Sequence, residues 1–139
     1  MRRGWIGIVA AVGLLAAGCG GGSGTTTGNA GSTTASKPLV VLVTDVGQLN
    51  DHGFNQLAYE GLKRAERDLG IEGRVYQANS AQDYIPNLAR AAQQHADLVV
   101  SVGFDQADAI ATTAKKFPQT HFAIIDVSNA DLTGRPGNV

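Results

Sequence analysis

The sequence of this chain predicts an α/β fold, a doubly wound parallel sheet. Three observations support this prediction. Short, uninterrupted apolar runs rich in β-branched residues recur from residue 39 onward, and such runs are typical of strands that are buried on both faces of a sheet. Segments whose apolar residues recur at helical spacing separate these runs. Glycine or proline stands where two of the predicted helices end.

The first strand and helix have the clearest pattern. The run Leu39–Thr44 predicts a buried strand, and a loop rich in Gly, Asn and Asp follows at Asp45–Gly53. A helix is predicted from Phe54 to Leu69, because apolar residues occupy one face and charged residues the other. Gly70 is the expected end of that helix. The apolar positions are Phe54, Leu57, Ala58, Gly61, Leu62, Ala65 and Leu69.

A second strand and helix repeat this order. Arg74–Ala78 is predicted to form a short strand, and a helix is predicted from about Tyr84 to His95. Asp83 is placed to cap that helix with its carboxylate. Pro86 falls in the first turn, where a missing N–H is tolerated.

The remaining segments complete the pattern. Leu98–Val102 is predicted to be the third strand, and Asp105–Phe117 the third helix, which Pro118 ends. His121–Ile125 is predicted to be the fourth strand. Four strands interleaved with three helices predict parallel βαβ units with right-handed crossovers.

The first 19 residues predict an exported protein. Arg2 and Arg3 form a short positive start, and the run Trp5–Ala17 carries no charge. A positive start, a short apolar run and small residues before a cut site describe a secretory signal peptide. The run is shorter than the roughly 20 apolar residues that a membrane-spanning helix needs.

The single cysteine, Cys19, stands at the predicted cut site and has no second cysteine with which to form an internal disulfide. The small residues Ala17 and Gly18 before it resemble the lipobox of bacterial lipoproteins, although Ala16 occupies the position that usually holds Leu. The resemblance implies that Cys19 is lipidated and anchors the protein on the extracytoplasmic face of the cell membrane. The alternative is an ordinary signal peptide with an incidental cysteine.

Residues 20–37 are nearly all Gly, Ser, Thr, Ala and Asn. This composition predicts a flexible linker, because it cannot bury enough apolar surface to become ordered. The predicted organisation is therefore a signal peptide at 1–19, a linker at 20–37 and a folded domain from 38 to 139. Removal of the signal peptide leaves nine basic and twelve acidic residues, and a mildly acidic domain without a basic cluster is a poor candidate for binding nucleic acid, so no nucleic-acid partner is predicted.

Two carboxylates and one helix start are the candidate binding groups. Ligands of open α/β sheets bind at the carboxyl ends of the strands, where Asp45 and Asp126 follow the first and fourth strands. Each alone is equally explained by turn formation, but both at one edge favour binding of ligand hydroxyls or amines. Phe54 and Asn55 begin the first helix at the same edge, which suits a stacking surface and a hydrogen-bonding amide. The alternative for Phe54 is a core residue.

The sequence offers few catalytic groups. His52, His95 and His121 fall in a loop, at a helix end and at a strand start, without metal-ligand spacing. The Gly-x-Ser-x-Gly nucleophile motif is absent from the sequence. These features favour a binding protein over an enzyme and predict neither a metal nor a cofactor.

Five short segments after Pro38 form an ordered series. They read V-L-V-T-D-V-G-Q-L-N-D-H-G-F-N-Q (Val41–Gln56), E-G-L-K (Glu60–Lys63), D-Y-I-P-N-L (Asp83–Leu88), A-D-L-V-V-S-V-G-F (Ala96–Phe104) and F-A-I-I-D (Phe122–Asp126). In this order, behind a lipoprotein signal, they resemble the basic membrane protein family of lipoproteins, the substrate-binding proteins of nucleoside ABC transporters.

The resemblance implies a type I periplasmic-binding-protein fold, in which two Rossmann-like lobes close on the ligand. By position, Asp45 and Asn55 would hydrogen-bond a nucleoside, Phe54 would stack on its base, and Asp126 would bind from the ribose side. The remaining contacts of the family come from later in the chain. We therefore expect this sequence to be the N-terminal part of a longer protein, with one lobe incomplete.

The leading functional hypothesis is a lipid-anchored receptor that captures a purine or other nucleoside and delivers it to an ABC transporter permease. One alternative is a ligand sensor or regulator on the same fold, and another is a non-functional truncated fragment. A third is an enzyme such as a nucleoside hydrolase. The enzyme would need a metal-binding cluster of aspartates, whereas the loop from Asp45 to Asp51 holds two separated ones.

Overall fold

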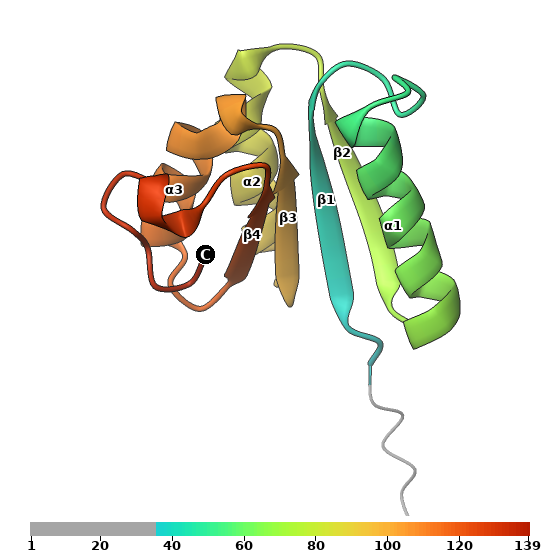
Figure 1. Ribbon diagram of the computed structural model, residues 1–139. Helices are drawn as coiled ribbons and strands as arrows, with labels where there is room; N and C mark the ends of the chain where they lie inside the picture. The colour runs from blue at the N-terminus through green and yellow to red at the C-terminus, as the bar shows by residue number, and fades with distance from the viewer. Residues whose placement is uncertain (1–35) are drawn as a thin grey trace, which may run out of the picture. The chain divides into compact units, whose positions relative to one another are not determined.

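Residues 36–139 are described in the computed structural model, and they form a four-stranded parallel sheet with helices on both faces (Figure 1). The predicted α/β fold is confirmed. The predicted signal peptide at 1–19, Cys19 and all but the last two residues of the predicted linker lie outside the described residues. The strands are β1 (Leu39–Val46), β2 (Glu72–Ala78), β3 (Leu98–Val102) and β4 (His121–Ile125). The helices are α1 (Phe54–Leu69), α2 (Tyr84–Gln93) and α3 (Ala107–Lys116), and short 3-10 turns lie at Ala81–Asp83, Phe104–Gln106 and Asn129–Asp131.

The strand order is β2-β1-β3-β4, and all neighbours pair in parallel. The chain moves outward from β1 to β2 and then crosses back over β1 to form β3. Because crossovers in such sheets are right-handed, α1 lies on one face while α2 and α3 lie on the other (Figure 1). The direction of winding therefore reverses between β1 and β3. Doubly wound sheets bind their ligands at such a switch point.

The face under α2 and α3 holds the larger core. Val41 and Val43 of β1 belong to this core, whereas Leu42 belongs to the core under α1, as the alternation of side chains along a strand requires. Leu88 of α2 and Ile110 of α3 are fully buried there. Each such side chain contributes about 1.5–3 kcal/mol when removed from water, so this face supplies most of the packing energy.

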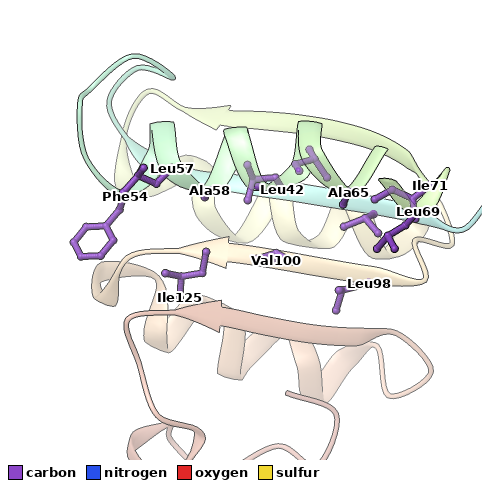
Figure 2. A pocket seen from close by; sticks show the side chains of 13 residues that line it. Leu42, Phe54, Leu57, Ala58, Ala65, Leu69, Ile71, Leu98, Val100 and Ile125 are labelled. Atoms are coloured by element: carbon purple, nitrogen blue, oxygen red, sulfur yellow. The ribbon is translucent and has the colours of Figure 1, made fainter. Parts of the chain in front are cut away.

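The face of α1 is only partly covered. Leu42, Leu62 and Val102 form its small buried core. Beside α1, an open groove of about 610 Å³ runs over β3 (Figure 2). Leu57 and Leu69 of α1 line it and remain largely exposed. We call this the apolar groove, and it is lined by Val40, Leu42, Phe54, Leu57, Ala58, Gly61, Leu62, Ala65, Leu69, Ile71, Leu98, Val100 and Ile125.

Helix α1 begins and ends where the sequence predicts, whereas β2 begins earlier. Strand β2 begins at Glu72 rather than at the predicted Arg74, because Glu72 and Gly73 pair with Leu39 and Val40 of β1. Both residue types have a low preference for strands. Pairing with a neighbouring strand overrides that preference.

Asp83 stands at the N-cap position of α2, as predicted, but its side chain does not cap the helix. Its carboxylate accepts hydrogen bonds from the N–H groups of Asn79 (2.9 Å) and Ser80 (3.1 Å) and makes no capping bond to α2. The Asp83 carboxylate therefore stabilises the turn between β2 and α2.

Helix α2 ends at Gln93, two residues before the predicted end at His95. His95 has a left-handed backbone with a φ of 57°.

The bounds of β1 and α3 also differ from the prediction, and α3 ends at Lys116 rather than Phe117. β1 continues to Val46, which pairs with Ala78 at the end of β2. α3 begins at Ala107 rather than Asp105, because a 3-10 turn at Phe104–Gln106 precedes it. Such tighter turns are common at helix starts.

Candidate functional site

A polar pocket lies where the parallel strands end, at the switch point between β1 and β3. Its volume is about 220 Å³. The four residues for which the sequence predicts ligand binding, Asp45, Phe54, Asn55 and Asp126, all line it. We call this the rim pocket, and its other lining residues are Val46, Asp51, Gly53, Gly103 and Phe104.

Asp45, near the end of β1, is held in place by hydrogen bonds from its own strand and from α2. Its Oδ1 accepts hydrogen bonds from the N–H of Val46 (2.6 Å) and from the hydroxyl of Tyr84 in α2. Its Oδ2 lies against Gly103, where a Cβ would collide with the carboxylate. Gly103 also has a φ of 93°, a conformation that side chains disfavour. The carboxylate thus reaches from β1 to β3 and forms part of the pocket wall.

Asn55, the second residue of α1, holds the backbone of Asp45. Its Oδ1 accepts a hydrogen bond from the Asp45 N–H (3.0 Å), and its Nδ2 donates to the Asp45 carbonyl (3.4 Å). The residue is only 2% exposed. An amide nitrogen carries two N–H groups, and the contact with the Asp45 carbonyl uses one of them.

Asp51 is a pocket residue that the sequence analysis missed. Its Oδ1 accepts hydrogen bonds from the N–H groups of Gly53 (2.7 Å) and Gln56 (3.1 Å), and its Oδ2 accepts one from Asn55 (3.3 Å). These bonds, that of Gly53 first, lower the pKa of Asp51 below its ordinary value of 3.8. Asp51 therefore caps α1 and orients its first turn, which begins at Phe54. An aspartate three residues before a predicted helix was the available signal.

Two aromatic rings border the rim pocket. Phe54 begins α1 and is 56% exposed, and Phe104 follows β3 and is 66% exposed. Figure 2 shows the Phe54 ring beyond the strand ends, away from Leu42 and Val100 in the middle of the apolar groove. Exposed rings at a pocket edge can stack on a planar ligand. Phe104 is not among the residues that the sequence analysis predicts to bind a ligand.

Asp126 follows β4 directly and is exposed. Its backbone is left-handed, with a φ of 76°. Aspartate and asparagine tolerate this conformation better than most side chains, and residues in it cluster at functional sites. The backbone conformation of Asp126 is compatible both with turn formation and with ligand binding, the two interpretations that the sequence leaves open.

Gln106 joins β1 and β3 just before the rim pocket. Its side chain is fully buried, and its Nε2 donates to the carbonyls of Val43 (3.2 Å) and Val102 (2.9 Å). One amide group therefore bridges the two strands from which Asp45 and Gly103 extend. This bridge holds the two strands together next to the rim pocket.

The charged groups that line the rim pocket accept hydrogen bonds. Three of its lining residues, Asp45, Asp51 and Asp126, are carboxylates, and an ionised carboxylate accepts hydrogen bonds without donating any. A ligand with several hydroxyl or amine donors fits this lining. Within residues 36–139, no three His, Cys, Asp or Glu side chains lie close enough together to hold a metal ion.

Comparison with known families agrees with this geometry. Residues 39–132 match the Bmp family, described as ABC transporter substrate-binding protein PnrA-like. The chain belongs to the Bmp family. The match includes all four strands and all four predicted site residues. The resemblance to basic membrane proteins is thereby confirmed, and the Bmp family consists of solute-binding proteins rather than enzymes.

Curated Bmp relatives are much longer than this chain. An uncharacterized lipoprotein of Pyrococcus abyssi is 40% identical over 113 residues, which cover 81% of this chain and 27% of the relative. The ABC transporter nucleoside-binding protein BmpA of Lactococcus lactis subsp. cremoris is 39% identical over 89 residues, which cover 61% of this chain and 25% of that protein. The chain thus spans about a quarter to a third of the length of the curated relatives it matches.

A solved structure supports the same fold. The ABC transporter system solute-binding protein of Aeropyrum pernix K1 superposes with a TM-score of 0.61 at 29% identity, covering 66% of this chain and 25% of that one. The parallel sheet of this Bmp-family chain therefore corresponds to part of the periplasmic-binding-protein fold. In the described part of the chain, none of the helices combines the length and the apolar character needed to cross a membrane.

Proposed function

We propose that this Bmp-family chain is part of a lipid-anchored, extracytoplasmic substrate-binding protein that captures nucleosides for an ABC transporter permease. The rim pocket carries the proposal, because the exposed ring of Phe54 stands beside the carboxylates of Asp45 and Asp126. A nucleoside combines a flat base with a sugar rich in hydroxyls, and the pocket has a surface for each. The name of the nucleoside-binding relative from Lactococcus supports the same ligand class.

Each pocket residue has a distinct proposed role. Phe54 stacks on one face of the base, a contact worth about 1–3 kcal/mol for bases on aromatic side chains. Asn55 donates its free N–H to the ligand from beside Asp45. Asp45 and Asp126 accept hydrogen bonds from ligand donors, with Asp126 on the ribose side, because adjacent hydroxyls of a sugar can donate to one carboxylate.

The rim pocket forms one wall of the proposed site. At about 220 Å³ it is smaller than the roughly 300–1,000 Å³ of pockets that bury a small ligand. The curated relatives extend far beyond the matched region, which is 25% of BmpA from Lactococcus. We propose that the second wall comes from the part of a family-length protein that follows this region.

Calorimetry on the complete gene product, without its signal peptide, tests the ligand class. A purine nucleoside, a pyrimidine nucleoside and free ribose are titrated into the protein. At least one nucleoside is expected to bind tenfold or more tightly than ribose, because ribose lacks the base that stacks on Phe54. If neither nucleoside binds, the proposed ligand is wrong, although membership of the Bmp family stands.

The proposed anchor is a lipid on Cys19. Relatives from three Pyrococcus species are named lipoproteins, which supports this part of the proposal. Cells that express the protein are fed radiolabelled palmitate and fractionated. The wild type is expected to carry label in the membrane fraction and Cys19→Ser to carry none. Equal labelling of both would exclude Cys19 as the lipid attachment site.

A further inference from the structure

Tyr84 does not line the rim pocket, yet it touches one of the carboxylates that do. It is the first residue of α2, on the face of the sheet opposite α1. Its ring belongs to the larger core, and its hydroxyl donates to Oδ1 of Asp45, 39 residues earlier in the chain. A residue on the far face of the sheet is therefore in direct contact with a candidate ligand-binding group.

The two oxygens of Asp45 have different surroundings. Oδ1 accepts two hydrogen bonds, one from Tyr84 and one from the N–H of Val46. Oδ2 lies against Gly103, which lines the rim pocket and has no side chain to cover it. The terminal torsion of aspartate is soft and roughly two-fold, so the orientation of the carboxylate depends on the hydrogen bonds to Oδ1, and Tyr84 donates the one that comes from another element of the fold.

We propose that Tyr84 is a positioning residue for ligand binding, which holds Oδ1 of Asp45 so that Oδ2 is presented to the ligand. The inference rests on the proposed function, because it assigns Oδ2 to the captured nucleoside. Burial, and after it the hydrogen bond to Asp45, raises the pKa of Tyr84 to about 12. The phenol therefore remains protonated, and so remains a donor, throughout the physiological pH range.

A purely structural role predicts a different result. A buried tyrosine hydroxyl needs a hydrogen-bond partner, and Asp45 would meet that need even if the orientation of its carboxylate were irrelevant to the ligand. Loss of the hydroxyl would then lower stability and leave affinity unchanged. Only a residue that acts through Asp45 loses its effect on affinity when Asp45 is absent.

A double-mutant cycle on the complete gene product separates the two roles. Nucleoside affinity is measured by calorimetry for the wild type, Tyr84→Phe, Asp45→Ala and the double variant. Phenylalanine keeps the buried ring, and circular dichroism checks that the fold is retained. Tyr76→Phe is the matched control, because the Tyr76 hydroxyl donates to Gln94 (2.6 Å) and Tyr76 does not line the rim pocket.

Tyr84→Phe is expected to weaken binding roughly tenfold, as for other hydrogen bonds to charged groups. In the Asp45→Ala background it is expected to change affinity less than about twofold, and Tyr76→Phe is expected to leave affinity unchanged. Unchanged affinity in Tyr84→Phe, or the same loss in both backgrounds, overturns the positioning role while the proposed function stands. Failure of the wild type to bind any nucleoside overturns the proposed function, and the assignment of Oδ2 with it.

Discussion

The rim pocket and the apolar groove are two hollows in the described part of the chain that differ in size and chemistry. The groove holds about 610 Å³ and the rim pocket about 220 Å³. Apolar side chains line the groove, so it has no polar side chain to orient a small ligand. Three carboxylates, an amide and two exposed rings meet in the rim pocket. The chemistry of the lining, rather than the volume, identifies the candidate site.

Each hollow follows from the topology of the sheet. Side chains at the ends of parallel strands gather at one edge, and the winding reverses there between β1 and β3. The groove instead lies on the face of the sheet where α1 is the one helix within the described domain. Parallel sheets normally carry helices across both faces. The apolar lining of the groove is therefore of the kind that a packed helix covers.

Adding one methyl group to a glycine in each region should have opposite effects on stability. Gly103→Ala is expected to destabilise the fold by about 2–4 kcal/mol, because the new Cβ meets Asp45 at a positive φ. Gly61→Ala in the groove is expected to stabilise it by about 0.5–1 kcal/mol, because open space surrounds this helical position. Urea unfolding measures both. Equal effects would show that the rim is not tightly packed around Asp45.

Asp126→Asn is expected to weaken nucleoside binding roughly tenfold, because a charged acceptor is replaced by a neutral amide. Its effect on stability should be small, since asparagine also tolerates the left-handed backbone at this position. Calorimetry gives the affinity, and thermal unfolding serves as the control. A drop in stability without a drop in affinity would assign Asp126 to the turn alone.

The pH dependence of stability tests whether the Asp51 carboxylate caps α1. Its pKa is lower in the folded protein than its ordinary value of 3.8, so its contribution to stability is fully present above that pH. The contribution is lost as the pH falls through the lower, folded-state pKa. Wild type should therefore lose stability faster than Asp51→Asn between about pH 5 and pH 2. Parallel curves for the two proteins would argue against the cap.

The smallest change in stability is expected for a substitution in the apolar groove. Leu57→Ser should change the free energy of unfolding by less than about 0.5 kcal/mol, because Leu57 is 66% exposed. Urea unfolding of this variant measures it. A loss above about 1.5 kcal/mol would mean that another part of the protein already covers the groove.

Local patterns in the sequence predict most of the fold. The boundaries of α1 follow from its apolar periodicity and from Gly70, whose left-handed φ of 69° ends the helix. Asp45 and Asp126 could be placed in one pocket because the ends of parallel strands share an edge. Both inferences depend on short-range signals and one general rule of sheet topology.

Contacts between distant segments could not be predicted in this way. Nothing in the local sequence indicates that the hydroxyl of Tyr84 reaches Asp45, because the two residues become neighbours only when α2 packs on the sheet. Phe104 was missed because an aromatic residue at a helix start has the same pattern whether it is buried or exposed. The early start of β2 at Glu72 likewise depends on pairing with β1.

The most direct test of the account compares a residue that lines both hollows with one that lines the apolar groove alone. Phe54 and Leu57 are exposed apolar side chains in the first turn of α1, and of the two only Phe54 lines the rim pocket. Nucleoside affinity of the complete gene product is measured by calorimetry for Phe54→Ala and Leu57→Ala. Phe54→Ala is expected to weaken binding by roughly tenfold to a hundredfold, and Leu57→Ala to leave it unchanged. Loss of binding in Leu57→Ala but not in Phe54→Ala would contradict the account and move the ligand to the apolar groove.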